Sequence, residues 1–120
     1  MVDRHSIKRP EMAVLRLDKT TGKQYIMQDD EFEWDDAKAT NNAARHGVTF
    51  EYARLVFADP FGVGIVDDRE DYGEERLIML GNVAGTLLFV AYTERDDRIR
   101  IISARRATRY EQEDYYEQNG

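Results

Sequence analysis

Residues 76–107, RLIMLGNVAGTLLFVAYTERDDRIRIISARRA, decide the fold of this chain. Apolar segments rich in β-branched and aromatic residues are typical of strands, and this chain has them at 32–34, 62–66, 76–80, 87–93 and 98–104. Turn-forming residues follow at Gly81 to Gly85 and at Glu94 to Asp97. Consecutive strands joined by such short links pair antiparallel. The segment 87–93 is apolar on both faces, so we expect it at the centre of the sheet.

Two helices are predicted between the first two strands. The segment Ala37 to His46 has a helical pattern, with Asp35 or Asp36 as its N-cap. Gly47 then stands where a glycine at positive φ commonly ends a helix. Thr49 is the expected N-cap of the second helix. The apolar face of that helix consists of Phe50, Ala53, Val56 and Phe57.

The C-terminal part of the chain predicts a third helix. Thr108 and Glu111 have the spacing of a capping box, and the helix is expected to continue to about Gln118. The sequence thus predicts an α+β domain over 32–120, in which two N-terminal helices and a C-terminal helix pack on a curled, mostly antiparallel sheet of four to five strands. Residues 1–31 are expected to be an N-terminal extension, either a small hairpin or a loosely attached segment.

Composition narrows the possible functions. The chain of 120 residues contains no cysteine, so disulfides and thiolate metal sites are excluded. Its longest apolar run, Leu87 to Tyr92, is far shorter than the ~20 residues of a membrane span. No Walker loop, dinucleotide fingerprint, nucleophile elbow or metal-ligand spacing occurs, so we expect no metal and no other cofactor. The first residues lack the apolar core of a secretory signal.

Charge is distributed unevenly along the chain. The formal net charge is -7, and the segment Asp67 to Glu75 holds six acidic residues against Arg69 alone. The segment 98–109 instead holds five arginines: Arg98, Arg100, Arg105, Arg106 and Arg109. An acidic protein with one basic region can present that region to phosphate groups.

The strand expected over 98–104 determines which face of the sheet these arginines occupy. Alternation places Arg98 and Arg100 on one face and Ile99 and Ile101 on the other, with Arg105 and Arg106 just beyond the strand end. Planar guanidinium groups match phosphate bidentately. The alternative interpretation is a solvated sheet face whose arginines pair with nearby acidic residues.

Three further residues have both a structural and a functional interpretation. His46 is either a cation at the C-terminal end of a helix or a general acid or base, since its reference pKa lies near neutrality. Trp34 is either a core residue or a platform on which a base stacks. Glu94 is either a turn residue or a base held near cations.

Several segments occur together in one order along the chain: FEWD (32–35), HGVTF (46–50), GEER (73–76), TER (93–95) and RIRIISARRAT (98–108). Together they resemble the BrnT family, the toxin half of bacterial type II BrnT–BrnA toxin–antitoxin modules. The resemblance covers Phe32 to Tyr116. It implies a compact RelE-like fold and a cytoplasmic toxin that cleaves RNA, inhibits translation and growth, and needs no metal.

The resemblance also implies partners and a reaction. The partners would be RNA and a BrnA-like ribbon-helix-helix antitoxin, which in turn binds operator DNA. In metal-independent cleavage the 2′-hydroxyl attacks the adjacent phosphate and the 5′-oxygen leaves. The residues expected to carry this chemistry are His46, Lys38, Glu94, Arg100 and Arg105. The residues expected to contact RNA are Trp34, Thr93, Arg95, Arg98, Ser103, Arg106 and Arg109.

A non-catalytic function remains the alternative. Gln112, Glu113 and Asp114 make the first turns of the last helix acidic. A helix of this charge favours a catalytically weak RelE-like interaction module, which would bind a ribbon-helix-helix antitoxin and co-regulate its operon.

Overall fold

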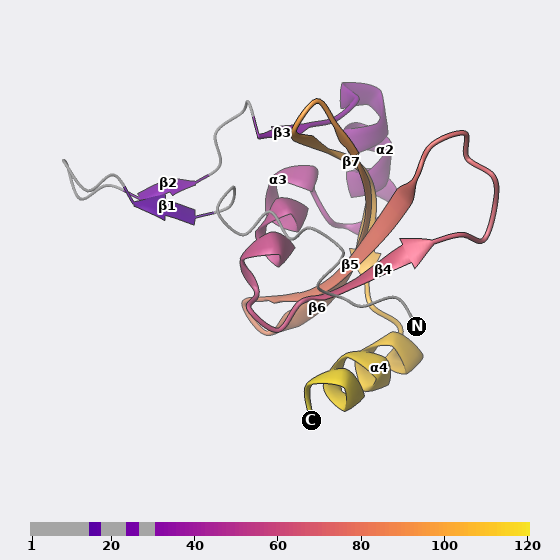
Figure 1. Ribbon diagram of the computed structural model, residues 1–120. Helices are drawn as coiled ribbons and strands as arrows, with labels where there is room; N and C mark the ends of the chain where they lie inside the picture. The colour runs from indigo at the N-terminus through magenta and orange to yellow at the C-terminus, as the bar shows by residue number, and fades with distance from the viewer. Residues whose placement is uncertain (1–14, 18–23, 27–30) are drawn as a thin grey trace.

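The computed structural model describes residues 15–17, 24–26 and 31–120. Its larger sheet has five strands in the order β3-β7-β6-β5-β4 (Figure 1). These strands span Phe32–Glu33 (β3), Val63–Asp67 (β4), Arg76–Val83 (β5), Thr86–Arg95 (β6) and Arg98–Arg106 (β7). The helices span Asp36–His46 (α2), Phe50–Ala53 (α3), Arg54–Ala58 (the 3-10 helix η2) and Arg109–Asn119 (α4).

The predicted antiparallel meander is confirmed. Strands β4, β5, β6 and β7 pair antiparallel in chain order, and β6 lies at the centre of the sheet. The short strand β3 joins the sheet differently, because it pairs parallel to β7 with Phe32 opposite Ile99. The chain is thus α+β, as predicted, with a sheet that is mostly but not wholly antiparallel.

Strands β1 (Leu15–Leu17) and β2 (Gln24–Ile26) form a separate antiparallel pair. Leu15 lies opposite Ile26, which is the pairing of a small hairpin. The remaining residues of the predicted hairpin, 13–14, 18–23 and 27, lie outside the described residues. The division of the chain at residue 31 stays a prediction.

The helix ends follow the local signals in the sequence. The Asp35 carboxylate accepts a hydrogen bond from the backbone N–H of Lys38 (2.9 Å), so Asp35 is the N-cap of α2. Gly47 ends α2 at φ 71°, a conformation that glycine adopts without steric cost. Thr49 caps α3, and Thr108 forms the predicted capping box with Glu111 at the start of α4.

The predicted second helix is α-helical only over α3 and continues as the 3-10 helix η2. Its apolar face is buried as expected. It lies against β5 at Gly81, where an added Cβ atom would come 2.8 Å from the Val56 Cβ atom. Gly81 therefore permits a close approach of η2 to the sheet, and the prediction that it belongs to a turn was wrong.

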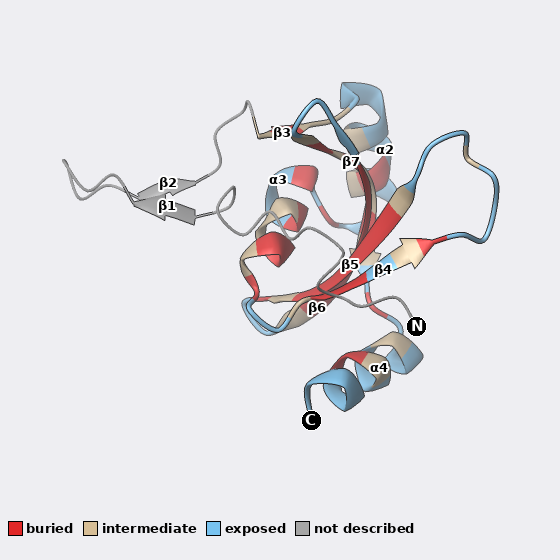
Figure 2. Cartoon of the chain, in the orientation of Figure 1, coloured by how far each residue is buried: buried red, intermediate tan, exposed pale blue. Residues whose placement is uncertain are grey.

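Buried side chains form two clusters, one on each face of the sheet. Figure 2 shows that the buried residues lie mainly along the strands of the larger sheet. We call the first face the helix face, because Phe50, Val56 and Phe57 of α3 and η2 pack there. We call the opposite side the open face. Helix α4 covers only one end of the open face, where Tyr115 packs with Leu80 and Phe89.

The strands extend beyond their predicted ends, and β7 is irregular. Arg105 and Arg106 belong to β7, so the prediction that they lie beyond the strand was wrong. Ala91 lies opposite Ser103 but Tyr92 lies opposite Ile101, so Ile102 is an extra residue in β7. Such a β-bulge reverses which residues face which side of the sheet, and this reversal decides where the arginines point.

Candidate functional site

The bulge at Ile102 distributes the arginines of β7 over both faces. Ile101 before the bulge and Ala104 after it both belong to the helix-face cluster. Alternation therefore places Arg98, Arg100 and Arg105 on the open face. Arg106 lies on the helix side, where it lines a small pocket with Gly47 and Thr49. The arginine-rich segment is thus not a single surface.

The open face carries a row of polar residues with one member from each strand of the larger sheet. We call this set the arginine row: Asp67, Arg76, Thr93, Arg100 and Glu33. Asp67 pairs with Arg76, Thr93 with Arg100, and Arg100 with Glu33. The pairing of Leu77 with Tyr92 brings Arg76 opposite Thr93. Facing residues on neighbouring strands lie about 5 Å apart, so Arg76 and Arg100 flank Thr93.

Most arginines of the open face are paired with carboxylates. Their distances are 3.1 Å for Arg95–Glu74, 3.5 Å for Arg98–Glu33, 2.8 Å for Arg100–Glu33 and 2.8 Å for Arg105–Glu111. Glu33 is therefore shared by two guanidinium groups. Arg98 also donates to the Phe32 carbonyl (3.1 Å), so one edge of the sheet is held together by charged side chains.

Arg76 differs from these arginines. Its guanidinium lies over the Tyr72 ring at 4.1 Å from the ring centre, and its buried Nε has no hydrogen-bond acceptor within the described part of the chain. The neighbouring Asp67 carboxylate accepts two hydrogen bonds from the Arg69 side chain (2.7 and 2.8 Å), one from the Arg69 backbone N–H (3.2 Å) and one from Tyr72 (3.2 Å). The hydrogen bond from Arg69 is the main cause that lowers the pKa of Asp67 to about 2.

Arg105 is bound to α4 rather than to the arginine row. Its guanidinium stacks over the Phe89 ring at 3.9 Å and donates to both oxygens of Glu111 (2.8 Å each). Burial alone would raise the pKa of Glu111, but the hydrogen bonds from Arg105 and Thr108 outweigh it and lower that pKa. Arg105 thus anchors the first turn of α4 to the sheet.

The two hydroxyl residues expected to contact RNA lie on the open face. The Thr93 hydroxyl donates to the Glu75 carbonyl (2.7 Å), and Thr93 is only 3% exposed. It therefore forms the floor between Arg76 and Arg100 rather than a contact surface. Ser103 is half-buried and lies opposite Ala91, between the arginine row and Arg105.

The other predicted site residues lie away from the row. Lys38 and His46 are exposed on α2, and neither side chain has a hydrogen bond or ion pair among the residues of 31–120. Glu94 is exposed near the end of β6. Trp34 packs edge-on against Phe50, with 5.9 Å between the ring centres. This contact agrees with the interpretation of Trp34 as a core residue. Arg109 is exposed on α4, 3.6 Å from Glu113.

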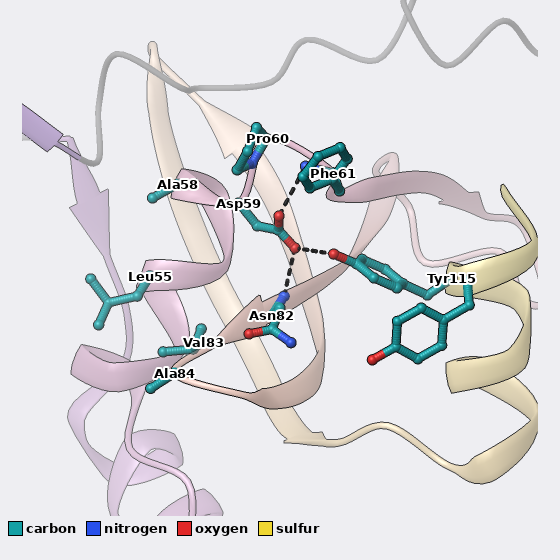
Figure 3. Close-up of a pocket in the computed structure, with 10 residues that line it drawn as sticks. Leu55, Ala58, Asp59, Pro60, Phe61, Asn82, Val83, Ala84 and Tyr115 are labelled. Carbon is teal, nitrogen blue, oxygen red and sulfur yellow. Dashed lines mark hydrogen bonds between the residues drawn. The ribbon is translucent and has the colours of Figure 1, made fainter. Parts of the chain in front are cut away.

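A separate cavity of about 580 Å³ lies between η2, the β5–β6 turn and α4 (Figure 3). Its buried carboxylate, Asp59, accepts hydrogen bonds from the Tyr115 hydroxyl (2.6 Å) and from the backbone N–H groups of Asn82 (2.7 Å) and Phe61 (2.9 Å). These bonds connect three parts of the fold. Asp59 therefore fixes the position of α4.

Three residues of the row, Asp67, Glu33 and Arg76, were not predicted as site residues. Glu33 and Arg76 belong to the segments FEWD and GEER, which carry the family resemblance. Cross-strand register was the missing information: Glu33 and Arg76 are far apart in the chain, and only the order β3-β7-β6-β5 places them on either side of Thr93 and Arg100.

The fold and the arginine row define a small α+β protein with polar and charged side chains from every strand on one face of its larger sheet. The chain belongs to the family of ribonuclease toxins, BrnT, of type II toxin–antitoxin systems, whose family model matches residues 34–111. The protein is thus a member of a toxin family whose activity is ribonuclease and whose systems include an antitoxin. No curated protein is similar enough to this chain to count as a relative. Within the described ranges, no helix is long and apolar enough to cross a membrane.

Proposed function

We propose that this protein is a metal-independent endoribonuclease that cleaves RNA in the bacterial cytoplasm and so inhibits translation and growth. The observation that supports this proposal best is the arginine row, in which Arg76 and Arg100 flank Thr93 on a part of the open face that α4 does not cover. Both side chains stand on the same face of the sheet, and guanidinium groups suit the oxygens of a phosphate. Family membership supplies RNA as the polyanion.

The reaction is attack of a ribose 2′-hydroxyl on the adjacent phosphorus, with departure of the 5′-oxygen. The protein must bind the phosphate, remove one proton and stabilise the extra negative charge of the transition state. Arg100 and Arg98 lie on the open face and are the residues proposed to stabilise this charge. Arg105, engaged by Glu111, contributes to the shape of the surface through α4.

The donor set of this surface supports metal independence. Mg²⁺ prefers several carboxylate or carbonyl oxygens together with water. The carboxylates on the open face, Glu33 and Asp67, are instead engaged by arginines. Positive guanidinium groups repel a cation and take over its electrostatic role toward phosphate.

The proposed partner is a BrnA-like ribbon-helix-helix antitoxin that covers the open face and binds operator DNA. A partner with acidic side chains would compete with RNA for the same guanidinium groups. Charge complementarity of this kind governs the rate of association more than its final strength. Reversal of a charge at the rim should therefore slow formation of the complex more than it speeds dissociation.

One observation favours a second candidate function, the interaction module without strong catalysis. Four arginines of the open face, Arg95, Arg98, Arg100 and Arg105, are already paired with carboxylates of the same chain. Internal pairing lowers the positive potential that RNA would encounter. An antitoxin could bind such a surface while RNA affinity stays weak.

An RNA cleavage assay separates the two functions. Purified antitoxin-free protein is incubated with single-stranded RNA, with and without EDTA, and the ends of the products are identified. The enzyme predicts fragments with 2′,3′-cyclic phosphate that form at the same rate in EDTA. Arg100→Ala should slow cleavage about 10²–10³-fold, whereas Arg45→Ala, an exposed arginine on α2, should not. A folded parent protein that leaves RNA intact would favour the interaction module.

A further inference from the structure

We propose that Arg76 and Arg100 bind the scissile phosphate from either side of Thr93, and that the Glu33 carboxylate accepts the proton of the attacking 2′-hydroxyl. This inference rests on the proposed ribonuclease function and assigns its reacting groups. It adds two residues, Arg76 and Glu33, that the sequence analysis did not select.

Arg76 has the properties of a phosphate ligand. The Tyr72 ring beneath the guanidinium orients it without using its N–H donors. The carboxylate that would otherwise neutralise it, Asp67, is occupied by Arg69. Its buried Nε has no acceptor among the described residues, and such a buried donor is costly unless a ligand or water satisfies it. An anion at this position would supply that acceptor.

Arg100 completes the phosphate site from the other side. It lies directly opposite Thr93 on the neighbouring strand, and its side chain is 28% exposed. Thr93 is buried between the two arginines, and its hydroxyl is held by the Glu75 carbonyl. Thr93 thus lies at the base of the site, between the strand positions of Arg76 and Arg100.

Glu33 is the carboxylate that lies beside Arg100. It pairs with Arg100 at 2.8 Å and with Arg98 at 3.5 Å, and its side chain is 23% exposed. A phosphate held by Arg100 would therefore place a neighbouring ribose next to Glu33. A general base must lie within hydrogen-bond reach of the proton that it removes, and this position meets that requirement.

In the proposed step the 2′-O–H bond breaks, its proton moves to a Glu33 oxygen, and the 2′-oxygen forms a bond to phosphorus. The bond from phosphorus to the 5′-oxygen breaks, and this oxygen takes a proton from water. Glu33 then returns its proton to solvent. The negative charge that builds up on the phosphate oxygens is stabilised by Arg76 and Arg100.

Glu33 also has a structural interpretation, since β3 spans only Phe32–Glu33 and the ion pairs help to hold it on β7. Glu33→Gln separates the two roles, because an amide oxygen still accepts the hydrogen bond from Arg100 but is not a base. Glu74→Gln is the matched control, as Glu74 is also paired with an arginine, Arg95.

The experiment measures single-turnover cleavage of RNA and binding of the same RNA with 2′-O-methyl riboses, which cannot react. Glu33→Gln should cleave about 10²–10⁴-fold more slowly, lose the acidic limb of the pH–rate profile and bind the inert RNA as the parent does. Arg76→Gln should cleave about 10²–10³-fold more slowly and bind the inert RNA more weakly. Its binding should also depend less on salt, by about one phosphate contact. Glu74→Gln should behave as the parent.

Two results would overturn the inference while the ribonuclease function stands. One is a Glu33→Gln variant that cleaves at the parental rate with the parental pH profile. The other is an Arg76→Gln variant with unchanged cleavage and binding. If Glu33→Gln melts below the assay temperature, Glu33→Asp replaces it, since it retains the charge and should retain part of the rate. Failure of the parent protein to cleave RNA would instead reject the proposed function itself.

Discussion

The side-chain amide of Asn42 is hydrogen-bonded to both backbone groups of Ala104. Its Nδ2 donates to the Ala104 carbonyl (2.7 Å) and its Oδ1 accepts from the Ala104 N–H (3.1 Å). Nδ2 also donates to the Val48 carbonyl (2.9 Å), so one buried amide joins α2, the loop after it and β7. Asn42 thereby closes the outer edge of the strand that carries Arg100 and Arg105.

Replacement of Asn42 by alanine should therefore destabilise the whole domain. It leaves buried backbone groups of Ala104 and Val48 without a partner, at a cost of about 1–3 kcal/mol for each group. We expect the free energy of unfolding in urea to fall by at least about 2 kcal/mol. Asn41, the exposed neighbour, is the control, since Asn41→Ala should change the free energy of unfolding by no more than about 0.5 kcal/mol. Equal stability of the two variants would contradict this role of Asn42.

Removal of the Tyr115 hydroxyl should loosen α4. This hydroxyl donates to the buried Asp59 at 2.6 Å, and hydrogen bonds to charged groups contribute about 1.5–3 kcal/mol. Tyr115→Phe should therefore lower stability by about that amount and speed amide exchange within α4 more than within β6. Tyr116→Phe is the control, because Tyr116 is 58% exposed. If Tyr115→Phe speeds amide exchange equally in α4 and in β6, Asp59 does not hold this helix.

The pair of Asp67 and Arg69 should make stability depend on pH in acid. The pKa of Asp67 falls from 3.8 to about 2 on folding, so its contribution is fully present above about pH 4 and is lost as the pH falls through 2. Because Arg69 is 65% exposed, we discount the contribution to about 1–2 kcal/mol. The free energy of unfolding in urea should be measured at pH 6 and at pH 2. For Asp67→Asn, the part of the fall between these pH values that comes from Asp67 should be missing. The exposed Asp68→Asn should retain it.

Local signals in the sequence predicted the elements and several of the helix ends. Asp35, Gly47, Thr49 and Thr108 each act through a backbone group within four residues, so their roles do not depend on the rest of the fold. The meander was predictable for the same reason, since short links between strands leave antiparallel pairing as the simple choice. The resemblance to BrnT toxins, carried by a few short segments, is confirmed by the family to which the chain belongs.

The candidate site was harder to predict because it depends on register. The extra residue Ile102 moves Arg105 to the open face and Arg106 to the helix side, and no local pattern marks a bulge there. Glu33 reaches Arg100 only through the parallel pairing of β3, a strand of two residues. Arrangements of this kind are set by tertiary packing, which a periodic pattern does not record.

Replacement of His46 tests the hypothesis, made from the sequence, that this residue is a general acid or base. It ends α2 beside Gly47, and the pocket lined by Gly47 and Arg106 lies on the helix side of β7, whereas Arg100 lies on the open face. The cationic form of His46 suits the C-terminal end of a helix and should contribute at most about 1 kcal/mol to stability. We therefore expect His46→Asn to keep the rate of RNA cleavage and its pH profile.

The comparison with Glu33→Gln makes the His46 measurement decisive. If His46 transfers a proton, His46→Asn should remain folded but cleave about 10²–10⁴-fold more slowly, and one limb of the pH–rate profile should disappear. If Glu33 alone removes the proton, only Glu33→Gln should show this loss. A loss in both variants, on opposite limbs of the profile, would identify Glu33 as the base and His46 as the acid. In that case RNA would have to pass around the edge of β7 to reach both residues, and inert RNA should protect the amide groups of α2 as well as those of β7 from exchange.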